Sequence, residues 1–208
     1  MNGRFITLEG GEGVGKSTQA HALAAALRAR GIDLIETREP GGSAGAEAIR
    51  ALLLEGAGDR WSPRAEALLF AAARADHVGK TILPAIAAGR WVICDRFLDS
   101  SLAYQGGADG VGAETIRTLH RIGSNGLLPD RTLLLHMPIS EASRRQSIAG
   151  IAQSDRFEKR DGGFHDRVAA AFLANAEAEP DRIRVIDAQG APEDVTARLL
   201  SELSDLVP

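Results

Sequence analysis

Residues 10–17 read GGEGVGKS and match G-x-x-x-x-G-K-[ST], a pattern that binds phosphate groups. Gly10 and Gly15 permit backbone angles that a Cβ would forbid, and they let the main chain approach a phosphate closely. The amides of such a loop form a nest for an anion. Lys16 adds a positive charge that reaches the β- and γ-phosphates, and the Ser17 hydroxyl is a ligand for Mg²⁺. This stretch predicts a site for a triphosphate tail and its metal ion.

The segments on either side of this loop are the ones that the motif requires. Residues 4–8 form a short apolar run that predicts a buried strand, and residues 18–30 are rich in Ala and Leu and predict a helix that Gly31 ends. Such a helix directs its positive end at the bound anion. A glycine-rich turn without a ligand is the alternative, and the order strand, loop, helix disfavours it.

Two charged residues follow the next buried run. Residues 91–94 are apolar throughout and predict a strand covered on both faces, and Asp95 and Arg96 come directly after it. An acid there binds or orients Mg²⁺ through water, and an arginine beside it forks onto phosphate oxygens. A surface ion pair at a strand end is the alternative. A phosphate-binding loop in the same sheet favours the functional interpretation.

Residues 38–42, REPGG, follow a predicted strand at residues 32–37. Pro40 and the glycines impose a rigid turn that permits close approach of a ligand. Glu39 and nearby Arg50 would face a second phosphate group there. A plain connecting turn is the alternative interpretation.

A third group of side chains suits a nucleobase. Phe70 and Arg74 lie four residues apart on a predicted helix and share one face, so a ring would stack on a base while a guanidinium donates to a carbonyl oxygen. The alternative for Phe70 is a place in the core. Hydroxyl and amide groups that match a pyrimidine edge follow at Ser100, Ser101, Tyr104 and Gln105.

The whole chain alternates predicted strands with predicted helices. The strands are expected at residues 4–8, 32–37, 91–94, 132–136 and 182–186. The helices are expected at residues 18–30, 46–54, 64–89 with a division at Pro84, 98–104, 113–122, from 141, 164–178 and 192–206. This order predicts one α/β domain over residues 1–208 with a parallel sheet and right-handed crossovers. Ligands of such sheets bind at the carboxyl ends of the strands, so residues 10–17, 38–43 and 95–105 are expected to form the site.

Residues 149–163 contain few apolar side chains and predict a mobile loop or lid. Three arginines flank this segment: Arg144, Arg145 and Arg156. Mobile arginines that close on a γ-phosphate stabilise charge in phosphoryl transfer and exclude water. A solvated charged helix face is the alternative.

Composition narrows the class of protein further. The 208 residues are 44% apolar and 25% charged, as in soluble globular proteins. A net charge of -4 without a Lys/Arg block argues against nucleic acid as a partner. Cys94 is the only cysteine, which excludes an intrachain disulfide and a cysteine zinc cluster. The start of the sequence does not have the pattern of a signal peptide, and no apolar run is long enough for a membrane span, so a cytoplasmic enzyme is expected.

Together these segments resemble bacterial thymidylate kinases, which are P-loop nucleoside monophosphate kinases. The likeness covers the whole chain and is carried by FITLEGGEGVGKST, TREPGG, EALLFAAARADHV, DRFLDSSLAYQG, LPDRTLLLHM, DRFE and RVIDA. The resemblance implies a three-layer P-loop kinase fold, in which helices flank a five-stranded parallel sheet. It also implies transfer of the γ-phosphoryl group of ATP to dTMP with Mg²⁺, in a homodimer.

The resemblance also assigns roles by position. ATP would be bound by Gly10, Gly11, Glu12, Gly13, Val14, Gly15, Lys16, Ser17 and Thr18. The dTMP side would be formed by Glu39, Arg50, Phe70, Arg74, Arg96, Ser101, Tyr104 and Gln105, with Arg50 on the phosphate, Phe70 stacked on thymine and Arg74 on a base oxygen. The metal ligands would be Ser17 and Asp95, and the catalytic residues Lys16, Asp95, Arg96 and Arg156.

One segment departs from the family pattern. Glu12 inside the P-loop matches the bacterial type, in which the catalytic arginine comes from a lid, here at about residues 145–160. Lids of that type usually carry several arginines before DRFE, but residues 147–154 read SIAGIAQS and contain none.

Two other functions remain as alternatives. A GTP-binding switch would require an N/T-K-x-D segment, which the sequence lacks, and the nearer alternative is a kinase for another monophosphate or for a deoxynucleoside.

Overall fold

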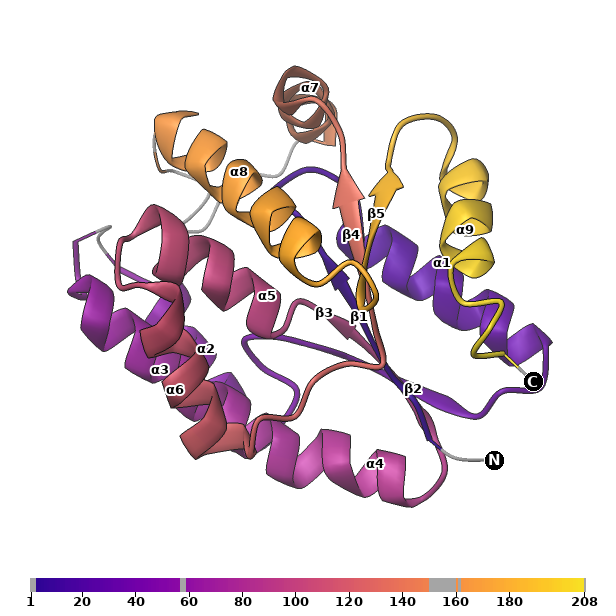
Figure 1. Ribbon diagram of the computed structural model, residues 1–208, viewed down its shortest axis with the longest axis horizontal. Coiled ribbons are helices and arrows are strands. Elements are labelled where there is room, and N and C mark those ends of the chain that lie inside the picture. Colours follow the sequence, from indigo (N-terminus) through magenta and orange to yellow (C-terminus); the bar gives the residue numbers. More distant parts are fainter. Residues whose placement is uncertain (1–2, 57–58, 150–159, 161, 208) are drawn as a thin grey trace.

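The computed structural model describes residues 3–56, 59–149, 160 and 162–207. Its centre is one parallel sheet of five strands in the order β2-β3-β1-β4-β5 (Figure 1). The strands are β1 (Phe5–Glu9), β2 (Leu34–Arg38), β3 (Trp91–Asp95), β4 (Arg131–His136) and β5 (Ile183–Asp187). The predicted strands and their parallel arrangement are therefore confirmed.

Helices cover both faces of the sheet, as in a three-layer α/β fold (Figure 1). Helices α1 (Lys16–Ala29) and α9 (Pro192–Ser201) lie together on one face. The other helices are α2 (Ala44–Leu54), α3 (Pro63–His77), α4 (Leu83–Ala87), α5 (Leu98–Ser101), α6 (Ala113–Ser124), α7 (Ile139–Ala149) and α8 (Gly162–Ala178). The apolar runs in the strands follow from this layering, because a strand covered on both faces has no solvent side.

The central strand divides its side chains between the two layers. Ile6 and Leu8 pack into the apolar cluster formed with α1 and α9, whereas Phe5 packs into the cluster on the opposite face. Successive strand residues alternate between faces, so Thr7 and Glu9 point to the same face as Phe5. Two buried polar residues, Thr7 and Glu9, therefore face the layer that contains α5.

Two predicted helices contain π-helical turns. The predicted segment 64–89 is divided into α3, a π-helix at Val78–Ile82 and α4, with Pro84 in the first turn of α4. Proline has no amide hydrogen, so the ordinary bond to the preceding turn is lost there. The predicted helix 98–104 is α5 followed by a π-helix at Leu102–Ala108.

The predicted boundary of the last helix was wrong. Helix α9 ends at Ser201, and the chain continues to residue 206 in turns with bonds of the i to i−3 type, such as Leu206 N to Leu203 O at 2.9 Å. The apolar pattern continued past the helix because Leu203 is fully buried in the core. Among the described residues no helix combines the length and apolar character needed to cross a membrane.

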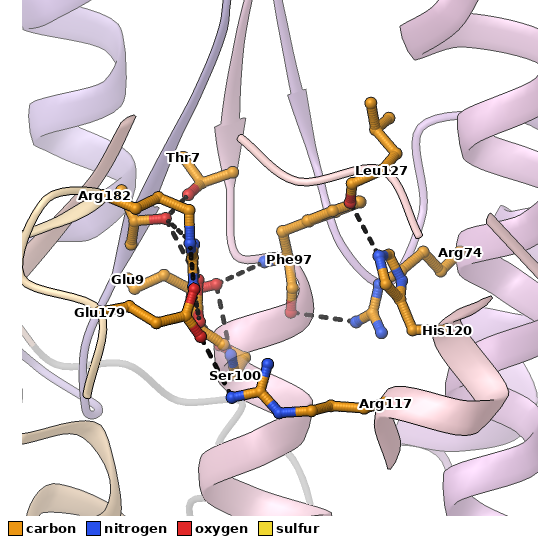
Figure 2. Close-up of polar contacts among 12 residues, drawn as sticks. Thr7, Glu9, Arg74, Phe97, Ser100, Arg117, His120, Leu127, Glu179 and Arg182 are labelled. Atoms are coloured by element: carbon orange, nitrogen blue, oxygen red, sulfur yellow. Dashed lines mark hydrogen bonds and ion pairs between the residues drawn. The ribbon is translucent and has the colours of Figure 1, made fainter. Parts of the chain in front are cut away.

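A buried polar network ties α5 to the sheet behind it (Figure 2). Both carboxylate oxygens of Asp99 accept hydrogen bonds from Arg182, each at 2.8 Å, and Thr132 donates to the same carboxylate at 3.1 Å. Arg182 also donates to Glu179, which accepts a further bond from Arg117 of α6. This network connects α5 to β4, to α6 and to the turn between α8 and β5.

Candidate active site

A cavity of about 800 Å³ opens at the carboxyl edge of the sheet. The three segments that the sequence singled out, after β1, β2 and β3, all line it, as the rule for parallel sheets predicts. Its lining includes Glu12 to Gln19, Arg38, Glu39, Pro40, Arg50, Leu54, Phe70, Arg74, Asp95, Arg96, Phe97, Ser100, Ser101, Tyr104, Gln105, Arg145, Ala188, Gly190, Pro192 and Val195. Gly10 and Gly11 lie apart from it and line a smaller cavity of about 130 Å³.

The phosphate-binding loop has the backbone that its glycines allow. Gly10 has a φ of 138°, and a Cβ there would lie 2.4 Å from the carbonyl oxygen of Leu135, so the position excludes any side chain. Gly15, with a φ of 93°, precedes the first residue of α1. Lys16 lies against the loop and donates to Gly11 O at 2.6 Å. Burial lowers the pKa of Lys16, and Arg96 lowers it further against the opposing charge of Glu12.

Ser17 and Asp95 both line the cavity and are hydrogen-bonded to each other. The Ser17 hydroxyl donates to Asp95 Oδ2 at 2.6 Å, and Asp95 Oδ1 is buried without a hydrogen-bond partner among the described residues. A buried carboxylate oxygen beside a hydroxyl suits Mg²⁺, which binds through one or two carboxylates and takes its other ligands from water and phosphates. The described residues hold no group of three or more His, Cys, Asp or Glu arranged for a metal.

Arg96 extends from the end of β3 toward the phosphate-binding loop. Its φ of 68° lies in the left-handed region, which is uncommon for a residue with a long side chain. The guanidinium donates to Glu12 at 2.6 Å, to Gly10 O at 3.0 Å and to Ser100 Oγ at 3.0 Å. The side chain is therefore held in one orientation between the loop and α5.

Glu12 is the anionic partner of that arginine. Burial alone would raise the pKa of Glu12, but the positive charges of Arg96 and Lys16 lower it to about 2. The Tyr104 hydroxyl donates to the same carboxylate at 2.8 Å, and the Arg96 guanidinium lies 5.2 Å from the centre of the Tyr104 ring. The sequence predicted that Glu12, Arg96 and Tyr104 belong to the site, but it did not predict that they form one cluster.

Glu9 is a residue at this edge that the sequence analysis missed. It is the last residue of β1 and is completely buried, and its carboxylate accepts bonds from the Phe97 and Ser100 amides at 2.8 and 3.2 Å. Burial and the nearby negative charge of Asp99 raise the pKa of Glu9 to about 7. An acidic residue on the buried face of a central strand was the signal that would have identified it.

The pH dependence of stability should reveal this group. The unfolded chain ionises Glu9 near pH 4.5 and the folded chain near pH 7, so the unfolded state binds fewer protons between these values. The free energy of unfolding of the wild-type protein should therefore fall by about 3 kcal/mol relative to Glu9→Gln from pH 4.5 to 7 and then stay level. Urea denaturation of both proteins across this range checks it. Parallel curves would contradict the buried ionisation.

Two predicted dTMP-side residues form a buried ion pair. Arg74 Nε donates to Glu39 Oε2 at 2.8 Å, and its guanidinium also donates to Ser101 Oγ at 2.8 Å. His77 bonds the other Glu39 oxygen at 3.0 Å and Thr37 at 2.7 Å. Glu39 lines the cavity, but both of its oxygens are occupied by Arg74 and His77. Its carboxylate therefore fixes the orientation of Arg74.

The remaining predicted residues on this side also meet at the cavity. Arg50 donates to Pro40 O at 2.7 Å, and Phe70 is partly buried in the cavity wall. The amide of Gln105 donates to Glu66 Oε1 at 2.9 Å. Glu66, which the sequence analysis did not identify, fixes which way this amide faces.

The arginines of the predicted lid divide between different environments. Arg145 lines the cavity and donates to Ala188 O at 3.2 Å. Arg144 pairs with Glu141 at 2.8 Å and is exposed. Arg156 and most of the predicted lid at residues 145–160 lie outside the described residues.

Comparisons with known proteins identify the family of the chain. A family model described as thymidylate kinase matches residues 8–199. A thymidylate kinase of Rhizorhabdus wittichii is 76% identical over 208 residues, which cover both chains completely. One of Chromohalobacter salexigens is 50% identical over 204 residues, 98% of this chain and 96% of the relative. The crystal structure of the thymidylate kinase of Ehrlichia chaffeensis matches with a TM-score of 0.78 and 32% identity over 98% of this chain and 99% of that one. The chain therefore belongs to the thymidylate kinase family.

Proposed function

We propose that the protein transfers the γ-phosphoryl group of ATP to dTMP, giving dTDP and ADP. The observation that carries this proposal is the position of Arg96 in one continuous cavity. Besides Arg96, this cavity is lined by Lys16 and Ser17 of the phosphate-binding loop and by Phe70 and Arg74 of α3. A guanidinium between two phosphate sites is suited to bridge donor and acceptor.

The ATP side of the proposal rests on the phosphate-binding loop. Main-chain amides between Gly10 and Thr18 would hold the phosphates, at the positive end of α1. Lys16 would neutralise charge on the transferred group. Ser17 and Asp95 would hold Mg²⁺, which supplies charge neutralisation at the phosphate oxygens.

The dTMP side rests on α2, α3 and the segment after β3. Arg50 would bind the monophosphate, Phe70 would stack on the thymine ring, and Arg74 would donate to a base oxygen. Ser101, Tyr104 and Gln105 would complete the base and sugar site, and Glu39 would support the dTMP side through Arg74. Glu39 orients the Arg74 guanidinium, and Glu66 orients the Gln105 amide. The polar groups of this pocket are therefore oriented before a base binds.

The chemistry asks little of a general base. The attacking oxygen belongs to a phosphate and is already anionic, so positioning and neutralisation of charge carry the rate. Lys16 and Arg96 would supply this neutralisation.

Arg156 would be a further catalytic residue, and residues 145–160 would form a lid. Residues 1–208 would form a single domain, and the protein would act in the cytoplasm, where ATP is available.

A panel of acceptors at fixed ATP tests the activity and its specificity. Of dTMP, dUMP, dCMP, dGMP and AMP, we expect dTMP to give the highest kcat/KM, because the pocket offers both a ring for stacking and an oriented amide. Stoichiometric formation of dTDP and ADP distinguishes a kinase from a nucleotide switch, which hydrolyses its nucleotide slowly. Preference for a purine monophosphate would reject the pyrimidine pocket.

The proposal includes a homodimer. Helices α2, α3 and α6 lie side by side (Figure 1), and each exposes a large apolar side chain: Leu52 at 40%, Leu68 at 56% and Ile122 at 77%. Large apolar side chains gathered on neighbouring helices mark an interaction surface, and a second copy of the chain would bury the same face symmetrically.

Sedimentation of variants tests this surface. Leu68→Glu and Ile122→Glu should shift the protein to monomers, because each would bury an unpaired charge in the dimer. Leu83→Glu is the matched control, since Leu83 is 40% exposed and lies on α4, which is not one of these three helices. A wild-type protein that sediments as a monomer at micromolar concentration would refute the dimer.

A further inference from the structure

The Glu9 carboxylate accepts three hydrogen bonds from the segment that follows Arg96. Its Oε1 accepts from the Phe97 amide at 2.8 Å and from the Ser100 amide at 3.2 Å, and its Oε2 accepts from the Ser100 hydroxyl at 2.5 Å (Figure 2). Glu9 is not among the residues that line the large cavity. The carboxylate therefore acts on neighbouring residues of the chain and not on a ligand.

The Ser100 hydroxyl connects this carboxylate to the arginine. Arg96 donates to Ser100 Oγ at 3.0 Å, and Ser100 donates to Glu9 at 2.5 Å. A guanidinium can only donate, so Ser100 Oγ accepts from Arg96. Above pH 7, where Glu9 is ionised and can only accept, the single hydroxyl hydrogen points at Glu9. The three side chains form a directed chain of hydrogen bonds, and a carboxylate at its end strengthens it.

The backbone of Arg96 also needs support from its surroundings. Its left-handed φ of 68° is unfavourable for a side chain of this kind and persists only where neighbouring groups fix it. The Arg96 amide donates to Leu8 O at 2.9 Å, and the next amide, that of Phe97, donates to Glu9. Consecutive residues at the end of β1 thus hold consecutive amides of this turn.

We propose that Glu9 is a positioning residue for phosphoryl transfer, which holds the Arg96 guanidinium across the phosphate-binding loop through Ser100 and the Phe97 amide. This inference rests on the proposed function of Arg96 between the two phosphate sites. A shift of the guanidinium by about 1 Å would cost up to 100-fold in rate. The role requires neither proton transfer by Glu9 nor contact with a nucleotide.

Glu9→Gln tests the chain of hydrogen bonds with almost no change in volume. The amide oxygen still accepts from the two backbone amides, but the NH₂ group faces Ser100 Oγ as a second donor and competes with Arg96. We expect kcat to fall about ten-fold or more, with the KM for ATP within about two-fold and a melting temperature at pH 8 no lower than that of the wild type. A purely structural residue would lose stability together with activity.

Ser100→Ala removes only the hydroxyl that connects Arg96 to Glu9. This variant still tests the proposal if Glu9→Gln folds poorly. We expect kcat to fall about five-fold or more in this variant. The double variant should be no slower than the slower single variant, because both substitutions break the same chain. Multiplied losses in the double variant would show that Glu9 does not act through Ser100.

Arg182→Lys is the matched control, because Arg182 lies in the turn before β5 and contacts α5 through Asp99. It breaks the paired bonds to Asp99, next to Ser100 in the chain, without changing Glu9, Ser100 or Arg96. We expect a lower melting temperature with kcat within about two-fold of the wild type. A kcat for Glu9→Gln within about two-fold of the wild type, or an equal loss in Arg182→Lys, would overturn the proposal. Absence of dTMP-dependent turnover in the wild type would instead refute the proposed function.

Discussion

Replacement of Lys16 by alanine should lower kcat about 1,000-fold while dTMP binding changes little. Lys16 is buried, and its ammonium lies against the phosphate-binding loop, 2.6 Å from Gly11 O. A positive charge in such an environment interacts strongly with the charge that develops on the transferred group. The residues assigned to dTMP lie on α2, α3 and the segment after β3, so they keep their geometry.

Steady-state kinetics and calorimetric titration separate these two effects. Coupled measurement of ADP release gives kcat, and titration with dTMP in the absence of ATP gives the dissociation constant. Lys80→Ala is the matched control, because Lys80 is an exposed lysine that pairs with Asp76 on the protein surface. Turnover of Lys16→Ala within ten-fold of the wild type would remove the phosphate-binding loop from the mechanism.

Local patterns were sufficient to predict the fold and the edge of the sheet at which the large cavity opens. The glycine loop, the Asp95-Arg96 pair and the turn at residues 38–42 each follow a strand, and parallel strands bring their carboxyl ends to one edge. That geometrical rule needs only the order of elements. It explains why the predicted site segments line one cavity although they are far apart in the sequence.

The pairing of side chains inside the site could not be predicted in the same way. Glu39 was expected to face a phosphate, but it bonds Arg74 and His77, which lie on α3. Gln105 bonds Glu66, and Glu9 bonds the segment after Arg96. Each of these contacts depends on how a helix packs against the sheet, and no short sequence pattern contains that information.

The sequence pattern also could not predict where helices end or change their type. The segment after Arg96 carries Ser101, Tyr104 and Gln105, and one ordinary helix was expected over residues 98–104. It begins as α5 and continues as a π-helix. A wider helical turn changes which side chains share a face, and such turns are frequent at functional sites. The sequence identified the chemical groups, and the irregular helix set their directions.

Replacement of Arg96 by lysine should lower kcat by about 100- to 1,000-fold although the charge is kept. The Arg96 guanidinium uses one terminal nitrogen for Glu12 and the other for Gly10 O and Ser100 Oγ. A lysine ammonium is a compact point charge without this planar fork, so it cannot hold Glu12 and Ser100 together while it faces two phosphates. The loss should therefore appear in kcat more than in the KM for either nucleotide.

Arg90→Lys is the matched control, since Arg90 pairs with Asp33 outside the cavity lining and should tolerate the same exchange. Comparison with Lys16→Ala then separates charge from geometry. Lys16→Ala removes a charge, whereas Arg96→Lys retains one and removes only its shape and its partners. A kcat for Arg96→Lys within about five-fold of the wild type would mean that charge at this position suffices. The cluster of Glu12, Ser100 and Tyr104 around Arg96 would then serve stability and not the orientation of a catalytic group.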